Sequence, residues 1–334
     1  MLRSPAFADT LVIVNEFGEV GLDHLLVEAV EDGMVLLSAG CLCCTVRGDL
    51  VRTLEDLLRR RDNGRISPFR RVVVETTGLA DPIPVLAAVL HHPYLRLRYA
   101  VDGVTTTVDA LLGAATLERQ PEACRQVAVA DRIVVTKTDL ADGVSDPELV
   151  RRLRELNPSA PKLDAADPAL DMSSGGLFRP DGKIADVGDW LAAERLSHSQ
   201  DHHGPDPNRH SPTISSFVLT SDRPVGQGAF DMFIDLIGST FGGRVLRLKG
   251  LVEFADTPGR PVLVQGAGHV LHVPAVLPGW PDDDRRTRLV FIVDDVPRQA
   301  VERIWNAFSG RPAIDEPDGA ALGDNPLAPS TLVR

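Results

Sequence analysis

The chain has few cysteines, and most of them lie in one place. Of the four cysteines in 334 residues, Cys41, Cys43 and Cys44 all occur in the stretch "SAGCLCCTVRGDL" at residues 38–50. Such a distribution does not form the disulfide framework of a small secreted domain. The N-terminal stretch "MLRSPAFADT" also lacks the apolar core of a secretory signal. These features predict a cytoplasmic protein whose thiols stay reduced.

Positive charge and long apolar runs are also scarce. The chain carries 35 Lys and Arg against 47 Asp and Glu, a net charge of −12, which argues against nucleic acid or an anionic membrane surface as the main partner. No apolar run approaches the roughly 20 residues that span a bilayer. With 43% hydrophobic and 25% charged residues, the composition is that of a globular protein. The length predicts about two domains.

In the first half of the chain, apolar runs alternate with helical patterns. The runs end in polar or glycine residues, as buried parallel strands do, at residues 10–18, 34–40, 71–78, 103–110 and 131–139. Leucines at helical spacing predict a helix from residue 46 to 60, and Pro82 suits the first turn of another. This alternation predicts an α/β fold, with a mostly parallel sheet that carries helices on both faces. Ligands of such sheets bind at the carboxyl ends of the strands.

The pattern changes after residue 195. Residues 196–212 contain His198, His202, His203 and His210 among Pro, Gly, Asp and Ser, which is typical of a flexible linker. We expect a first domain at 1–195, a smaller α+β domain with an antiparallel sheet at 213–310, and a disordered tail at 311–334. The linker histidines predict a weak, pH-sensitive accessory metal site, or alternatively only a solvated linker.

The clustered cysteines suggest metal binding. Thiolates are preferred ligands of zinc, and cysteines close together can hold one ion from a short loop. The adjacent Cys43 and Cys44 are awkward in a closed structural zinc site, so an open or exchangeable site is favoured. The alternative is that these cysteines are small buried hydrophobic residues. Cys124 differs from them: it stands alone in an expected helix at residues 117–130, where core packing is favoured.

Two further strand ends carry residues suited to nucleotide chemistry. Glu75 ends an apolar strand, where a carboxylate can hold Mg²⁺, and Gly78 can offer its N–H to a γ-phosphate. Many buried strands end in an acid, so this signal alone is weak. In "TKTD", Lys137 can lie along a base and Asp139 can accept two hydrogen bonds from a guanine edge. The alternative for that stretch is a simple boundary between strand and turn.

Together these motifs resemble the CobW-like GTPases of the CobW/HypB/UreG group. The stretches "VIVNEFGEVGLD", "GCLCCTVRGDL", "VVVETTGLADP", "DGVTTTVDA" and "ADRIVVTKTDL" occur in that family's order, and the resemblance extends to residue 308 through "LRLKG". It implies a P-loop-NTPase-like domain followed by a CobW C-terminal domain. It also implies that the protein is a GTPase and, as in zinc-handling members, a metallochaperone.

Site residues follow from the same resemblance. Cys41, Cys43 and Cys44 match the family's C-x-C-C metal ligands, and Glu75 and Gly78 match its Walker-B-like switch. The guanine-specificity motif is matched by Thr136, Lys137 and Asp139, with Thr in place of the usual Asn. The implied cofactors are Zn²⁺ (or Co²⁺), GTP and Mg²⁺. The implied partners are a client metalloprotein and GTP, together with a homo-oligomer partner as a further possibility, but neither nucleic acid nor a membrane.

One motif of the family has no match in the printed sequence. The first strand and its G-x-x-G-x-G-K-[ST] phosphate loop should precede residue 12, yet no Gly-Lys-Ser/Thr occurs in the 334 residues. We expect an N-terminally truncated form, because the switch and guanine motifs would otherwise have no reason to persist. The leading hypothesis is a GTP-dependent zinc metallochaperone. The alternatives are a non-enzymatic metal-binding module with a vestigial nucleotide site, and a cobalt-handling protein of cobalamin or metalloenzyme assembly.

Overall fold

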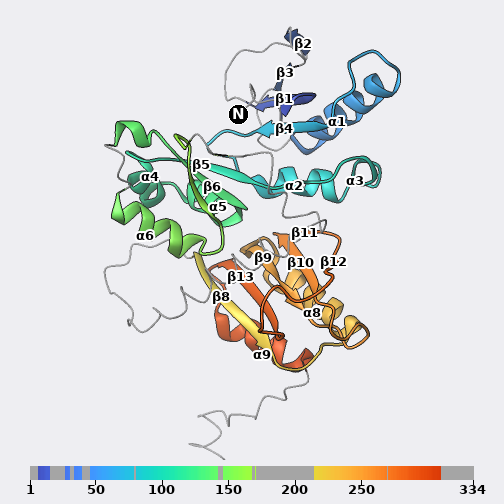
Figure 1. Ribbon diagram of the computed structural model, residues 1–334, viewed down its shortest axis with the longest axis vertical. Helices are drawn as coiled ribbons and strands as arrows, with labels where there is room; N and C mark the ends of the chain where they lie inside the picture. Colours follow the sequence, from blue (N-terminus) through green and yellow to red (C-terminus); the bar gives the residue numbers. More distant parts are fainter. Residues whose placement is uncertain are drawn as a thin grey trace, which may run out of the picture.

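A computed structural model of the chain shows an N-terminal α/β part and a C-terminal part built on an antiparallel sheet (Figure 1). None of the described helices combines the length and apolar composition that crossing a bilayer requires. The described residues are 7–15, 27–30, 34–39, 46–78, 80–141, 146–167, 170, 214–268 and 270–309.

The first sheet contains the three parallel strands that the sequence predicts near its N-terminus. β1 (Thr10–Asn15) lies between β3 (Met34–Ala39) and β4 (Arg71–Glu75) and is parallel to both. A fourth strand, β2 (Val27–Val30), pairs antiparallel with β3 and was not expected. The strand order is therefore β2-β3-β1-β4. The prediction of a mostly parallel sheet is confirmed here, with one antiparallel strand at the edge.

Three helices share a hydrophobic core with this sheet. α1 (Val46–Asp62) is the helix expected from its leucine spacing, and α2 (Pro82–Leu90) begins at the proline expected in its first turn. The short helix α3 (Leu95–Arg98) follows. One cluster joins leucines of α1 to strand β1 and to the later helices, and its buried members include Leu11, Ile13, Leu50, Leu54, Leu57, Leu58, Ala88 and Leu95.

The second sheet is smaller and wholly parallel, with order β5-β6-β7. Its strands are β5 (Thr105–Asp109), β6 (Arg132–Thr136) and β7 (Lys162–Asp164). Within the described residues no strand pairing joins β4 to β5, so the parallel strands form two sheets rather than one.

The helices of the second sheet correct one expectation. Residues 117–130 do not form a single helix: α4 (Gly113–Arg119) ends before Gln120, and α5 (Pro121–Val129) starts with proline as its first residue. Proline has no N–H to donate, so it begins a helix well but interrupts one. A third helix, α6 (Pro147–Leu156), completes this layer.

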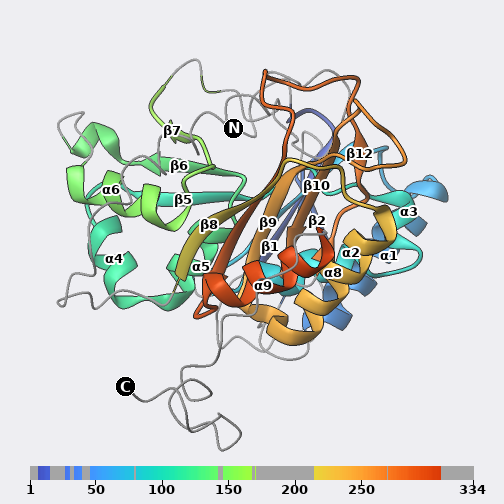
Figure 2. The ribbon, with the colours of Figure 1, turned by 90° about the horizontal axis from the view of Figure 1, so that it is seen from below.

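The C-terminal part is an antiparallel sheet of order β11-β10-β9-β13-β8, with β12 beside β10. Helices α8 and α9 cover one of its faces (Figure 2). The smaller α+β domain with an antiparallel sheet that the sequence predicts here is confirmed. Their bounds are β8 (Ile214–Ser221), α8 (Gln227–Phe241), β9 (Val245–Val252), β10 (Val262–Ala267), β11 (Val270–Leu271), β12 (Ala275–Val276), β13 (Thr287–Asp294) and α9 (Arg298–Phe308).

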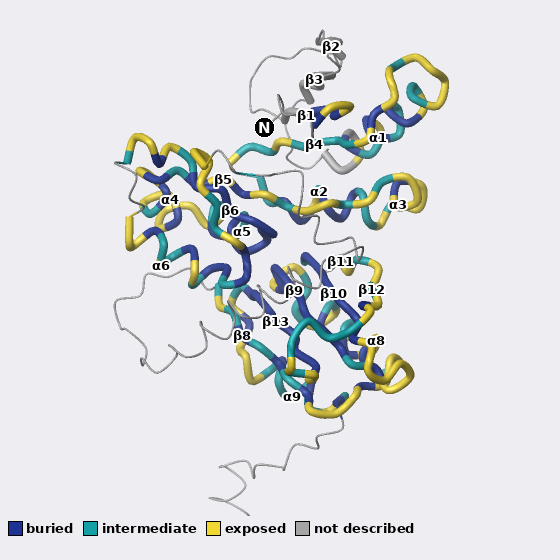
Figure 3. Tube along the Cα trace, viewed as in Figure 1, coloured by how far each residue is buried: buried dark blue, intermediate teal, exposed yellow. Residues whose placement is uncertain are grey.

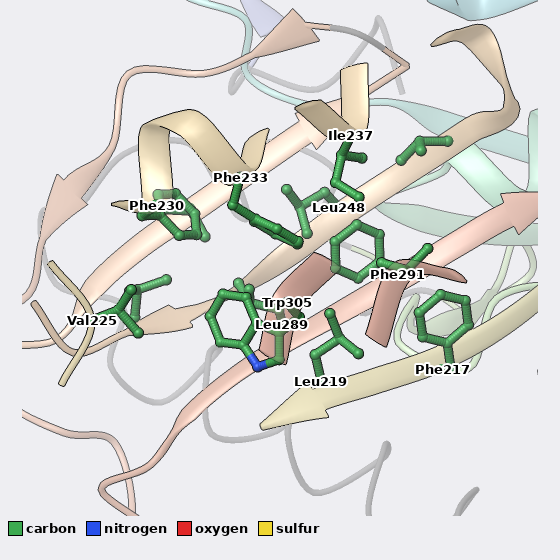
Figure 4. Close-up of a cluster of buried hydrophobic side chains, with 14 of the residues drawn as sticks. Phe217, Leu219, Val225, Phe230, Phe233, Ile237, Leu248, Leu289, Phe291 and Trp305 are labelled. Carbon is green, nitrogen blue, oxygen red and sulfur yellow. The ribbon is translucent and has the colours of Figure 1, made fainter. Parts of the chain in front are cut away.

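An aromatic cluster forms the core between these helices and the sheet (Figure 4). Phe233 of α8 makes edge-on contacts with Trp305 of α9, at 5.0 Å between ring centroids, and with Phe291 of β13, at 6.2 Å. The Trp305 indole N–H donates to the backbone oxygen of Thr220, 3.1 Å away. Because the one polar atom of this ring is satisfied, the ring can stay in the core.

The other face of the C-terminal sheet packs against α2 and α5. Figure 3 shows buried residues at the end of α5 and along β9 and β10. At this interface, Arg247 of β9 forms an ion pair with Asp131 and donates to the backbone oxygen of Val129, 3.2 Å away. The apolar members of the interface are Ile83, Leu86, Ala128, Val129, Leu246, Ala267 and Ile292. The two parts of the chain therefore share a core.

A histidine near this interface makes stability depend on pH. Burial and, to a smaller extent, the positive charge of Arg247 lower the pKa of His272 to about 4, with Asp131 partly opposing them. Between pH 6.5 and 4 the unfolded chain takes up a proton that the folded chain does not, so stability falls as the pH falls through that window. Replacing His272 by glutamine should flatten this decline in urea unfolding at pH 7 to 4.5. Equal slopes for parent and variant would contradict the assignment.

Candidate functional site

The carboxyl ends of the first sheet's parallel strands lie side by side. In the register of the strands, Asn15 of β1 pairs with Ala39 of β3, and Val14 pairs with Glu75 of β4. The six residues 40–45 connect the end of β3 to the start of α1. The predicted metal ligands Cys41, Cys43 and Cys44 belong to this connection and lie outside the described residues. The strand ends thus bring the start of the cysteine segment and Glu75 to one edge.

The end of β4 and the loop after it carry the two residues predicted to contact Mg²⁺ and the γ-phosphate. Glu75 and Gly78 are both exposed, and open space surrounds the α-carbon of Gly78. Beyond them the backbone makes a turn in which the Ala80 N–H donates to the oxygen of Thr77, 3.1 Å away. The side chain of Gln126 donates to the oxygens of Thr77 and Ala80, at 3.1 and 2.8 Å. The loop therefore has a defined shape that α5 helps to hold.

The corresponding edge of the second sheet carries the predicted guanine motif. Thr136 ends β6, and its hydroxyl donates to the oxygen of Val108, 3.3 Å away. Lys137 takes a left-handed backbone conformation, with φ of 60°, and its Nζ lies 2.6 Å from Oδ2 of Asp109. This hydrogen bond, with two backbone N–H donors, holds the pKa of Asp109 below its usual range. Lys137 is thus oriented by the end of the neighbouring strand.

The turn that follows leaves Asp139 accessible. Thr138 is buried, and its hydroxyl donates to Oδ1 of Asp164, 2.6 Å away, at the end of β7. Within the described residues, Asp139 is exposed and forms no hydrogen bond or ion pair. An aspartate that binds a guanine edge needs both carboxylate oxygens available as acceptors. The arrangement of Asp139 meets this need, while Thr138 anchors the turn beneath it.

Asp109, Asp164 and Gln126 are site residues that the sequence alone did not reveal. A signal existed for Asp109, because it is the last residue of a predicted strand, as Glu75 is of β4. Asp164 likewise ends β7. Gln126 gives no such signal, since its role depends on how α5 sits against a loop 46 to 49 residues earlier in the chain.

The carboxyl edge of the first sheet and that of the second sheet do not form a single site within the part of the chain that the structure describes. Among the described residues, no hydrogen bond or ion pair links Glu75 or Gly78 to Thr136, Lys137 or Asp139. No group of three or more His, Cys, Asp and Glu within the described part could hold a metal ion. Metal binding at the three clustered cysteines therefore stays a prediction.

The fourth cysteine behaves as expected. Cys124 is fully buried on α5, and its thiol donates to the backbone oxygen of Leu117, 3.0 Å away. Burial raises the pKa of this thiol. A thiol held neutral in a hydrophobic core is a poor metal ligand, because metals bind the thiolate. The prediction that Cys124 is a core residue is confirmed.

Comparison with known proteins defines the class. Residues 1–164 match the CobW/HypB/UreG nucleotide-binding domain, and residues 214–309 match the cobalamin synthesis protein CobW C-terminal domain. The fold is similar to the crystal structure of the Zn(II)-bound YjiA GTPase from Escherichia coli, with a TM-score of 0.64 and 26% identity over 90% of each chain. The protein thus has a nucleotide-binding domain of the GTPase type followed by a CobW-type C-terminal domain.

Sequence relatives agree with this class. The chain is 32% identical over 299 residues to the zinc chaperone YjiA of Escherichia coli K12, covering 90% of this chain and 88% of that protein. It is 30% identical over 334 residues to the zinc chaperone CobW of a Sinorhizobium species, covering 89% and 88%. The zinc-regulated GTPase metalloprotein activator 1 of Schizosaccharomyces pombe is 29% identical over 167 residues, covering 48% and 39%. The chain belongs to the CobW/HypB/UreG family.

Proposed function

We propose that this protein is a GTP-dependent zinc metallochaperone that works in the cytoplasm. It binds zinc as cargo at Cys41, Cys43 and Cys44 and passes the metal to a client metalloprotein when GTP is hydrolysed. The observation that carries this proposal is the strand register, in which Ala39 and Glu75 flank the end of β1. A segment rich in thiols and a loop suited to phosphate chemistry therefore start from the same edge of one sheet. Relatives named as zinc chaperones support zinc rather than cobalt.

Each predicted residue has a distinct task in this proposal. The thiolates of the C-x-C-C segment grip the zinc ion, and the exposed carboxylate of Glu75 holds Mg²⁺ directly or through water. Bound Mg²⁺ supplies charge neutralisation on the β- and γ-phosphates. Asp139 accepts the donors of the guanine edge, and the Lys137 stem lies along the base. A change in the loop after β4 between GTP and GDP then alters the grip on the metal.

A second candidate function is a metal-binding module without GTPase activity. The observation that favours it is the absence of any Gly-Lys-Ser/Thr in the printed sequence. The phosphate loop supplies backbone N–H donors, a lysine and a Mg²⁺-binding hydroxyl, so a chain without it lacks most of the machinery for phosphoryl transfer. In this candidate function, zinc binding at the cysteines is retained and the nucleotide site is vestigial.

GTP hydrolysis by a chain that includes the phosphate loop separates the two candidates, because both predict an inactive printed chain. We expect the printed chain to hydrolyse GTP no faster than background, because losing even one preorganised donor costs about 3 kcal/mol in a transition state. A chain extended by an upstream segment that carries the phosphate loop should recover GTP-selective hydrolysis. In that extended chain, Asp139→Asn should shift kcat/KM toward xanthosine triphosphate by about 100-fold, because the amide can donate to the oxygen that replaces the guanine amino group.

The control for this experiment is Asp102→Asn, which removes an exposed carboxylate in the loop before β5. This variant should keep the preference for GTP. Robust turnover by the printed chain would contradict the assignment of phosphate binding to the upstream loop, since it requires a phosphate site within the printed residues. An unchanged preference in Asp139→Asn would remove Asp139 from the guanine site.

A further inference from the structure

Helix α5 touches both the loop after β4 and the C-terminal part of the chain. On the loop side, Gln126 donates to the backbone oxygens of Thr77 and Ala80, at 3.1 and 2.8 Å. These are the two ends of the turn that contains Gly78. The same Thr77 oxygen also accepts from the Ala80 N–H. The Gln126 side chain therefore stabilises a turn that already has its own backbone hydrogen bond. The backbone of Gln126 is fixed in turn, because its oxygen accepts from the Thr106 hydroxyl of β5 at 2.8 Å.

The neighbouring residue, Arg125, bridges the same loop to the C-terminal sheet. Its Nη1 lies 3.7 Å from Oδ2 of Asp81, and its Nη2 lies 2.7 Å from Oδ2 of Asp294 at the end of β13. Asp81 also caps α2 by accepting from the Ile83 N–H, 2.9 Å away. The Asp294 side chain is 16% exposed and that of Arg125 is 39% exposed, so solvent screens this bridge only in part.

Packing reinforces the connection on both sides. Val129, at the end of α5, is buried with Leu246 and Ile292 of the C-terminal sheet. Ile83 of α2 packs against Gly268, where a Cβ atom would come within 2.6 Å of the isoleucine side chain. Gly268 has a φ of 60°, a left-handed conformation that favours glycine. The lack of a side chain also leaves room for Ile83. The loop, α2, α5 and the C-terminal sheet are thus in continuous contact.

We propose that Arg125 and Gln126 are positioning residues that couple the conformation of the loop at Thr77, Gly78 and Ala80 to the C-terminal sheet. A movement of this loop either breaks the two Gln126 hydrogen bonds or moves α5, and α5 is fixed to β13 through Arg125 and Asp294. The conformational equilibrium of the loop and the position of the sheet are therefore coupled, and the coupling acts equally in both directions. The use of this coupling in a nucleotide-driven metal cycle rests on the proposed function, whereas the contacts themselves do not.

Amide hydrogen exchange of the full chain tests the coupling without nucleotide or metal. The reporters are the Ala80 and Ile83 amides, which are hydrogen-bonded in the loop and at the helix cap. Gln126→Ala should speed their exchange about tenfold. This factor corresponds to losing the net stabilisation of about one hydrogen bond or slightly more. Asp294→Asn should speed it about threefold, although Asp294 lies in the other part of the chain. Arg125→Lys, which keeps the charge, should show a smaller increase than Arg125→Ala.

A matched control lies next to the tested residue. Asp295→Asn removes a carboxylate that pairs with Arg244 on the surface, 2.8 Å away, and it should leave the reporters at the parent rate. Amides of α6 serve as an internal reference for global stability.

The outcomes are distinct. Faster loop exchange in Asp294→Asn, with parent rates in Asp295→Asn and in α6, supports the coupling. A parent rate in Asp294→Asn would overturn it, even if Gln126→Ala loosens the loop. An equal acceleration in α6 would also overturn it, because the variants would then act through global stability. The exchange experiment contains no nucleotide or zinc. A negative result would therefore reject the coupling without rejecting the proposed function, and rejection of the proposed function would leave the coupling unaffected.

Discussion

Replacing Arg247 by alanine is expected to lower the free energy of unfolding by about 3–5 kcal/mol, because it leaves a buried carboxylate without its counter-charge. The Arg247 side chain is 3% exposed and that of Asp131 is fully buried. The Val104 N–H, 2.8 Å from the other carboxylate oxygen, stays as a donor but carries no charge. Urea denaturation of the parent and the variant measures the loss. A large effect would show that the ion pair between the two parts of the chain is needed for their common stability.

Arg244→Ala is the matched control for this prediction. Arg244 lies three residues earlier and pairs with Asp295, but the two side chains are 48% and 75% exposed. Exposed pairs contribute about 0–1 kcal/mol, so this variant should be close to the parent. Replacing both buried partners, by Arg247→Met with Asp131→Asn, should recover part of the stability because no unpaired charge remains. Equal losses in Arg247→Ala and Arg244→Ala would contradict the prediction.

Long apolar runs made most strands and helices predictable from the sequence. A short strand and a helix break at a proline were not predicted. Strands β1 and β6 each bury three consecutive apolar side chains, and β9, β10 and β13 are buried along most of their length, so their runs stand out in the sequence. β2 has only four residues, includes Glu28 and pairs with β3 alone, so its pattern does not stand out. The region around Pro121 suggested one helix because its apolar spacing continues across the proline. The missing N–H of the proline divides it into α4 and α5.

Candidate site residues could be selected from the sequence at strand ends, whereas their surroundings could not. Glu75, Thr136, Lys137 and Asp139 could be chosen because each lies at or just after the end of an apolar run. Their surroundings depend on contacts between distant parts of the chain, such as the pair of Lys137 with Asp109, which is 28 residues earlier. No local pattern encodes such a contact, because it exists only once the parallel strands are in register.

The largest effect is expected at the clustered cysteines. Changing Cys41, Cys43 and Cys44 together to serine should weaken Co²⁺ or Zn²⁺ binding by about a millionfold. A four-ligand zinc site provides about 10–16 kcal/mol of binding free energy, so each thiolate lost removes about 3 kcal/mol. Cobalt reports the change directly, because thiolate-to-metal charge-transfer absorption should appear in the parent and vanish in the variant.

Cys124→Ser is the matched control for the triple cysteine variant, because it removes a thiol outside the cluster. The Cys124 thiol is buried against the oxygen of Leu117, 3.0 Å away, and a serine hydroxyl can donate to the same oxygen. This variant should keep the metal affinity and the charge-transfer band of the parent. Loss of the band in Cys124→Ser alone would mean that the wrong cysteine has been assigned to the core.

Zinc titration of the fully reduced chain against a chromophoric chelator tests the central claim most directly. The account predicts one tightly bound zinc ion per chain, which persists in Cys124→Ser and after deletion of residues 198–210, and is lost in the triple cysteine variant. Deletion of the four histidines should remove only weak, pH-sensitive binding, because the sequence predicts a linker there and ordering a linker opposes each zinc contact. Tight zinc binding that survives in the triple cysteine variant would contradict the account.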